Sequence, residues 1–137
     1  MTANIEAWLK DHTTDQALIL AAQQNRADVL NYLLEQGGYL NVLDAYGNNA
    51  LWAACFAESP ECIDALLDAG IDIDYQNPSG ATALIYAASS GKNLIVAQLL
   101  RAGANPLLST QDDFTALDLA ATRQCLQLLR NAVKNHE

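Results

Sequence analysis

The chain has 137 residues, of which 51% are hydrophobic and 17% charged, and its formal net charge is −9. This balance favours one folded domain with a modest core and excludes a disordered polar chain. No hydrophobic run reaches the roughly 20 residues that cross a bilayer, and the first residues, MTANIEAWLKDH, lack the pattern of a signal peptide, so we expect a cytoplasmic protein without a membrane partner.

The acidic excess lies in one part of the sequence. No Lys or Arg occurs between Arg26 and Lys92, and that segment holds nine acids: Asp28, Glu35, Asp44, Glu58, Glu61, Asp64, Asp68, Asp72 and Asp74. Nucleic acid is therefore not an expected partner, because phosphate binding needs clustered Lys and Arg. The acids are compatible with a basic protein partner, and equally with a surface that only keeps the protein soluble.

The first predicted element is a helix over residues 1–12, where Ile5, Trp8 and Leu9 follow helical spacing. Beyond it the same pattern of residues recurs at a constant spacing, which equals the number of residues from Leu18 to Leu51. The columns in register include Leu18, Leu51, Leu84 and Leu117; Ala21, Ala54, Ala87 and Ala120; Leu33, Leu66 and Leu99; and Gly37, Gly70 and Gly103. We therefore divide a single domain into the predicted capping helix and repeats over 13–43, 44–76, 77–109 and 110–137.

Each repeat predicts a projecting turn, a short helix, a tight break, a second helix and a glycine stop. In the second repeat Ser59 is expected to cap the second helix, with Pro60 as its first residue. In the third repeat Gly103 is expected to end the second helix in the left-handed conformation. The apolar stripe predicted for that helix comprises Leu94, Ile95, Leu99 and Leu100.

The last repeat is shorter than the others. Its Leu128–Leu129 pair follows Leu99–Leu100 at a separation that is four positions short of the period. A short terminal copy that ends in RNAVKNHE is expected to be a cap with a polar outer face. Such a repeat cannot bury its apolar side alone, so its stability depends on the interface with its neighbour.

These repeats resemble the ankyrin repeat, whose unit reads roughly D-x-x-G-x-T-P-L-H-x-A-A followed by V-x-x-L-L-x-x-G-A. The matches in the third repeat are Gly80, Thr82, Leu84, Ala87, Ala88, Gly91, Val96, Leu99, Leu100, Gly103 and Ala104. The resemblance covers about residues 14–134. It implies an all-α ankyrin-repeat solenoid of about four helix-turn-helix repeats with short projecting hairpin turns, an N-terminal capping helix and a shortened C-terminal capping repeat.

The chain departs from the family at the start of each first helix. Where the family has Pro, Leu and His, this chain has ALW, ALI and ALD. The Thr–His hydrogen-bond network that the resemblance would imply is therefore absent, and Trp52, Ile85 and Asp118 stand in place of its histidine. We expect packing to hold the repeats together.

The residues do not indicate catalysis. The two histidines, His12 and His136, lie near opposite ends of the chain, and no Walker loop, G-x-S-x-G, H-E-x-x-H or EF-hand spacing occurs. A calcium cluster of Asp44, Asp72 and Asp74 would match no known loop. We expect no cofactor and no metal. The three cysteines, Cys55, Cys62 and Cys125, favour buried reduced thiols, with redox or metal roles as the alternative.

The resemblance implies that protein partners dock in a concave groove lined by the turn tips and first helices. The residues carried over to this surface as protein-binding are Tyr46, Asn48, Phe56, Tyr75, Ser79, Ser89, Ser90, Asp112, Phe114 and Arg123. Its aromatic members bury large areas at small entropy cost, as interface anchors do; alternatively they pack on neighbouring tips. The alternative surface is a convex stripe of Glu61, Asp64 and Asp68, whose spacing places them on one helix face.

We therefore expect a non-enzymatic, monomeric interaction module, an adaptor or inhibitor, that binds a protein partner with a basic surface. The alternatives are an enzyme regulator or small-molecule binder, or a substrate for asparagine hydroxylation at Asn41 or Asn105, which lie near the turn position that is modified in some family members.

Overall fold

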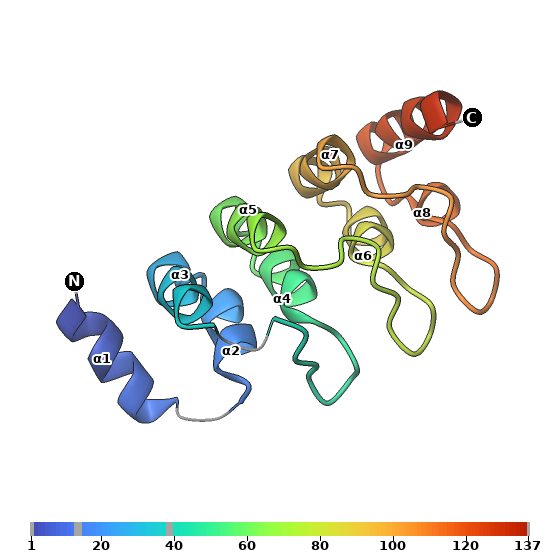
Figure 1. Ribbon diagram of the computed structural model, residues 1–137. Helices are drawn as coiled ribbons and strands as arrows, with labels where there is room; N and C mark the ends of the chain where they lie inside the picture. Colours follow the sequence, from blue (N-terminus) through green and yellow to red (C-terminus); the bar gives the residue numbers. More distant parts are fainter. Residues whose placement is uncertain (1, 13–14, 38–39, 137) are drawn as a thin grey trace. The chain divides into compact units, whose positions relative to one another are not determined.

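The computed structural model describes residues 2–12, 15–37 and 40–136 (Figure 1). The regular elements in these ranges are all helices, which confirms the all-α prediction. They are α1 (Thr2–Asp11), α2 (Ala17–Gln23), α3 (Ala27–Glu35), α4 (Ala50–Phe56), α5 (Pro60–Asp68), α6 (Ala83–Ser89), α7 (Asn93–Arg101), α8 (Ala116–Leu119) and α9 (Arg123–His136). None of the described helices combines the length and hydrophobicity needed to span a membrane.

The helices form two compact units, residues 1–71 and 72–137, called here the first and the second unit. In the first unit α2 packs on α4, α3 packs on α5, and α1 contacts α3; in the second unit α6 packs on α8 and α7 on α9. Each unit therefore has a layer of inner helices (α2 and α4, or α6 and α8) and a layer of outer helices (α3 and α5, or α7 and α9). The loops that precede α4, α6 and α8 project away from the outer helices (Figure 1).

Small side chains allow the inner helices of each unit to approach closely. Ala21, Ala54 and Ala87, which occupy one column of the repeat, are completely buried. Leucines of another column are buried as well, with Leu51 and Leu84 at 1% exposure. Burial of this apolar surface drives the packing of helices that are too short to be stable alone.

One residue of the predicted apolar stripe of α7 does not lie in the core. Leu94 is 79% exposed, whereas Val96 is completely buried. Leu94 precedes the buried Leu99 by five residues, which places it about 140° away around the helix, while Val96 lies three residues away on the buried side. The prediction for Leu94 was therefore wrong, and those for Ile95 and Leu99 are confirmed.

Each inner helix of the last three repeats begins with a side-chain cap. Asn49 Oδ1 accepts from the Trp52 amide at 3.3 Å, and Thr82 Oγ1 accepts from the Ile85 amide at 3.1 Å. Thr115 forms a reciprocal capping box with Asp118, at 3.2 and 3.0 Å. These local hydrogen bonds fix the first turn of each helix. These caps were not predicted from the sequence, for which only packing was expected to stabilise the repeats.

The outer helices and the thiols agree with prediction. Ser59 caps α5 by accepting from the Cys62 amide at 3.3 Å, and Pro60 is the first helical residue. Gly103 ends α7 with φ +99°. Cys55, Cys62 and Cys125 are free and buried. Burial raises the pKa of the Cys62 thiol, so this thiol stays protonated at neutral pH.

A polar residue closes the turn of each projecting loop, again at the period of the repeat. Asp44 Oδ1 accepts from the amides of Tyr46 and Asn48 at 2.9 and 3.0 Å. Asn77 Oδ1 does the same for the amides of Ser79 and Ala81, both at 3.0 Å. Each turn is therefore preorganised by its own sequence.

The two hairpins of the second unit are also bonded to each other. The Gln111 amide donates to Ser79 O at 2.9 Å, and its side chain donates to Pro78 O at 2.6 Å. Gln76 Nε2 donates to Ser109 O at 3.1 Å. The backbone contact between Gln111 and Ser79 leaves no room for a side chain at Gly80, where a Cβ would lie 2.9 Å from the Gln111 backbone nitrogen.

Replacing Leu84 by Ala is expected to lower the free energy of unfolding by ~2–5 kcal/mol, because Leu84 is buried on α6 and its truncation leaves a cavity in the core of the second unit. Urea denaturation followed by circular dichroism measures this change. Leu107→Ala serves as the control: Leu107 is 47% exposed, and its truncation should cost less than ~1 kcal/mol. Equal urea midpoints for wild type and Leu84→Ala would contradict the packing described here.

Gly80→Ala is expected to be more destabilising than Gly103→Ala. Both glycines have positive φ, +83° and +99°, but an added Cβ meets nothing within 4 Å at Gly103. Backbone strain alone should cost about 1–2 kcal/mol at Gly103, and the contact with Gln111 should add about 1–3 kcal/mol at Gly80. Thermal unfolding of the two variants compares them. Equal losses would mean that the two hairpins separate in solution.

Candidate functional site

Three of the predicted binding residues lie in the first unit, on the hairpin 44–48 and at the end of α4. Tyr46 is 81% exposed and Phe56 is 67% exposed. Asn48 is half-buried, and its amide is held by the Asp44 carboxylate. The hairpin and α4 thus present two large aromatic surfaces to solvent.

Both aromatic residues sit on ordered backbone. The Tyr46 amide is bonded to Asp44 Oδ1, and Gly47 takes the positive φ of +80° that the turn requires. Phe56 is the last residue of α4, where the Ala57 amide still donates to Ala53 O at 3.0 Å. A partner that binds these rings therefore has little backbone to order.

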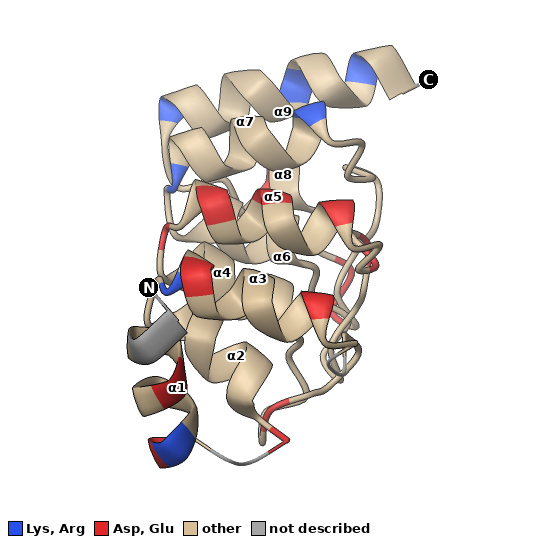
Figure 2. Ribbon diagram, turned by 60° about the vertical axis from the view of Figure 1, so that its left-hand side comes forward, with Lys and Arg blue, Asp and Glu red and all other residues tan. Residues whose placement is uncertain are grey.

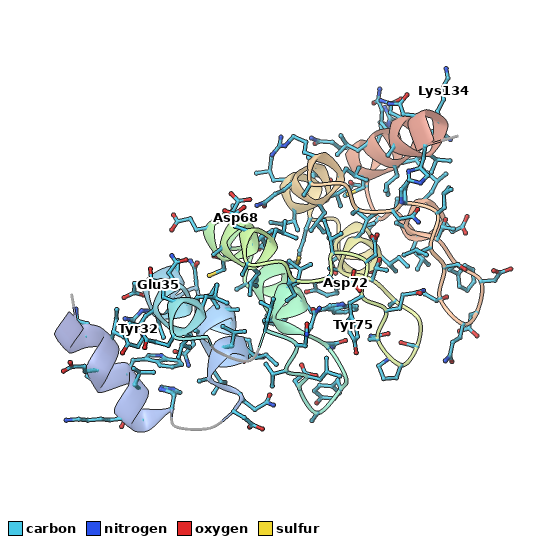
Figure 3. The ribbon with its side chains drawn as sticks, viewed as in Figure 1. Tyr32, Glu35, Asp68, Asp72, Tyr75 and Lys134 are labelled. Atoms are coloured by element: carbon cyan, nitrogen blue, oxygen red, sulfur yellow. The ribbon has the colours of Figure 1, made fainter. Side chains whose placement is uncertain are left out.

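The second unit holds the other hairpin positions. Ser79 and Asp112 are exposed on neighbouring hairpins that the Gln111 hydrogen bonds join. Phe114 is 47% exposed beside them. Tyr75, labelled in Figure 3, is half-buried, and its amide donates to Asp72 O at 3.3 Å. The structure therefore brings Ser79, Asp112 and Phe114 to one end of this unit.

Ser89 and Ser90 lie at the exposed C-terminal end of α6. The Ser89 hydroxyl donates to Tyr86 O at 3.0 Å, so it already has an intrahelical partner. Lys92 Nζ lies 5.9 Å from the centre of the Tyr86 ring, within the range of a cation–π contact. These residues form a polar end of the inner layer.

Arg123 does not lie where it was predicted. It was assigned to the exposed end of an inner helix, but it is the first residue of the outer helix α9. The inner helix α8 ends at Leu119, and Ala120, with φ −56° and ψ 120°, leaves the helical conformation. Helix α8 has four residues where α4 and α6 have seven, so most of the residues missing from the last repeat are lost from the end of its inner helix, and Arg123 falls in the outer layer.

The outer helices carry opposite charges in the two units (Figure 2). The predicted acidic stripe of Glu61, Asp64 and Asp68 is exposed on α5, and α3 adds Asp28 and Glu35. Helices α7 and α9 contain no acid over their described lengths. Their cations are Arg101, Arg123, Arg130 and Lys134.

The inversion is clearest at one repeated position, the residue directly after the Leu–Leu pair of each outer helix. It is Glu35 in α3, Asp68 in α5, Arg101 in α7 and Arg130 in α9; Figure 3 labels Glu35 and Asp68. Residues 1–71 hold ten acids and two bases (net −8), and residues 72–137 hold six acids and five bases (net −1), which sum to −9. The acidic segment was predicted from the sequence and the cationic helices were not, although the absence of acids from 75–111 and 119–136 indicates them.

One acid of α3 has a close cationic neighbour. Arg26 donates from Nε and Nη2 to the two carboxylate oxygens of Asp28, both at 2.9 Å. These hydrogen bonds hold the pKa of the Asp28 carboxyl below its usual value. Asp28 therefore stays ionised well into mildly acidic solution.

The two histidines, the groups most often used in catalysis, belong to different units. His12 stacks on the Trp8 ring at 3.9 Å in the first unit, and its Nδ1 lies 2.8 Å from Trp8 O. His136 is exposed at the end of α9 in the second unit. Within the described ranges, no three His, Cys, Asp or Glu side chains are placed to hold a metal ion.

A family model described as ankyrin repeats (3 copies) matches residues 2–77 and 70–136. Over 119 residues the chain is 31% identical to palmitoyltransferase AKR1 of Lachancea kluyveri, a match that covers 84% of this chain and 16% of that protein. Over 113 residues it is 33% identical to the B-cell lymphoma 3 protein homolog of Mus musculus, covering 80% of this chain and 23% of that protein. It thus spans less than a quarter of either relative.

Among solved structures, the chain is similar to the crystal structure of the ankyrin repeat domain of Bcl-3, described as a unique member of the IkappaB protein family. The TM-score is 0.78 and the identity 29%, and the match covers 82% of this chain and 50% of that one. Ankyrin repeats are in general a binding scaffold, and they indicate a protein–protein interaction module. The sequence resemblance is thereby confirmed: the chain belongs to the ankyrin repeat family.

Proposed function

We propose that this chain is a non-catalytic adaptor or inhibitor that binds a protein partner through the hairpin 44–48 and the end of α4. The exposure of Tyr46 (81%) and Phe56 (67%) carries this proposal. Burial of such large exposed rings by a partner is favourable, and each ring has only two side-chain torsions to fix on binding. Such residues typically dominate the binding energy of an interface.

The charge of the first unit supports a partner with a basic surface. The unit has a net charge of −8, and Asp44 and Glu58 stand two residues from Tyr46 and Phe56 respectively. A negative electrostatic field raises the rate at which a basic protein associates with the aromatic surface, and added salt reduces this increase in rate. The acids of α3 and α5 offer the same partner a second surface on the outer layer.

The surroundings of the two histidines support a non-catalytic role. His12 is engaged with Trp8, and His136 belongs to the other unit. The name of palmitoyltransferase AKR1 includes an activity, but the match covers 16% of that protein. That activity is therefore not part of the proposal.

A double variant, Tyr46→Ala with Phe56→Ala, is expected to reduce recovery of the partner about tenfold or more, because each anchor of this kind contributes about 2 kcal/mol or more. Purified wild type and variant, immobilised at equal density, are incubated with extract of the native cell, and the bound proteins are quantified by mass spectrometry. The control is Leu94→Ala with Leu107→Ala, which removes exposed apolar surface (79% and 47%) from the second unit.

A third arm replaces the stripe on α5 by amides: Glu61→Gln, Asp64→Asn and Asp68→Asn. A partner lost with the aromatic double variant and kept with the control supports the proposed surface. A partner kept with the aromatic variant and lost with the amide variant would move the site to the outer helices. Equal recovery with every protein would refute both surfaces.

Asp28 is expected to titrate below the ordinary aspartate pKa, because its hydrogen bonds with Arg26 lower the pKa of its carboxyl. Because its pKa is lowered in the folded chain, the ion pair stabilises the fold above the ordinary aspartate pKa, and this contribution is lost as the pH falls through the lowered value. Carboxyl-carbon NMR measures the midpoint. Arg26→Gln should raise it and Arg101→Gln should not, whereas a midpoint unmoved by Arg26→Gln would mean that the ion pair does not persist in solution.

A further inference from the structure

The longest helix builds a groove on the outer layer of the second unit. Helix α9 has 14 residues and α7 has nine. The two are joined near their first residues, where the Thr122 hydroxyl and the Cys125 thiol both donate to Asn93 Oδ1, at 2.6 and 3.0 Å. The last turns of α9 therefore extend beyond the end of α7 and lie beside the loop that follows it.

This groove has a volume of about 640 Å³, within the range of ligand and peptide sites. Its floor is apolar and mostly small. The floor residues are Ala97, Leu100, Ala104, Pro106, Leu128 and Ala132. Alanine and proline at these positions let another chain approach the helices closely, while the two half-buried leucines offer apolar contact.

The rim is polar and cationic. Arg101 stands on the α7 side, and Asn131, Asn135 and His136 stand on the α9 side. None of the described residues that line the groove is an acid. The last carbonyl groups of α7 already accept from the amides of Ala102, Gly103 and Ala104 at 3.0–3.1 Å, so they do not need the Arg101 side chain.

The wider surface has the same sign. Arg130 and Lys134 lie on α9, and Lys134 points away from the helix into solvent (Figure 3). This layer would repel a basic partner and attract an acidic one. The groove is thus the reverse in charge of the first unit, to which the proposed function assigns a basic partner.

We propose that the groove between α7 and α9 binds an acidic peptide segment of a second protein. An aliphatic side chain of the segment lies on the floor between Leu100 and Leu128, and a neighbouring carboxylate pairs with the Arg101 guanidinium, which suits the planar carboxylate geometry. The proposal does not depend on the aromatic surface of the first unit.

The amides of the rim favour a peptide over a lipid carboxylate. Asn131 and Asn135 are four residues apart, so they lie on one face of α9 along the groove. Each carboxamide has both donors and acceptors, which match the backbone amides of a peptide. An alkyl chain would form no hydrogen bonds with these carboxamides.

The test is a phage-displayed library of random peptides, selected on the immobilised full chain and in parallel on Ala132→Glu. This variant places a carboxylate in the groove, and circular dichroism verifies that it folds. Enrichment of acidic peptides with one aliphatic residue, on wild type and not on Ala132→Glu, is the expected result. Basic or neutral peptides, equal enrichment on both proteins, or no enrichment at all would overturn the proposal.

The enriched peptide is then synthesised with a fluorophore and titrated by anisotropy. Arg101→Gln should weaken its binding about three- to tenfold, whereas Arg130→Gln, the same change on the same layer outside the groove, should alter it less than about twofold. Equal weakening by both changes would mean that the peptide is attracted by the overall positive charge of the layer and would contradict the proposed site. Displacement of the peptide by micromolar dodecanoate would reassign the groove to lipid carboxylates.

Discussion

Close packing of helices that cannot stand alone is the constraint on which the rest of this structure depends. The inner helices α2, α4 and α6 have seven residues each, too few to be stable in isolation. They gain stability where alanines at 0% exposure bring neighbours together. Because every repeat packs in the same way, its core positions must hold similar residues. Residues on the hairpins and on the exposed side of the outer helices remain free to vary. Those free positions carry the proposed binding surfaces.

The period explains why much of the fold could be predicted. The leucine at Leu84 and the glycine at Gly103 recur from one repeat to the next because each faces the same environment in its repeat. Prediction failed where one repeat departs from the average. Leu94 looks like part of an apolar stripe by composition, but Asp28 and Glu61 occupy the same position in other repeats, and its angle to Leu99 also turns it toward water. Arg123 was misplaced because the deletion shortens the inner helix and leaves the outer helix intact.

The candidate surfaces could be predicted in part from the sequence for the same reason. Turn chemistry at Asp44 and Gly47 places Tyr46 at a tip, so its exposure follows from local sequence. The groove beside α9 does not follow from local sequence. It depends on how far one helix extends past its neighbour and on which side chains line the resulting space, and neither has a repeated signal. A shortened, irregular terminal copy has no counterpart in the chain from which its contacts could be inferred.

The charge inversion is informative because the fold does not require it. Glu35, Asp68, Arg101 and Arg130 occupy equivalent positions, so packing would tolerate either sign at each. Random placement of charge for solubility would mix the signs within each unit. Instead the first unit has a net charge of −8, while the outer helices of the second are cationic and free of acids over their described lengths. Two surfaces of opposite sign cannot both attract the same uniformly charged partner. If both proposed surfaces bind, this distribution of charge would suit the proposed adaptor with two partners better than an inhibitor with one.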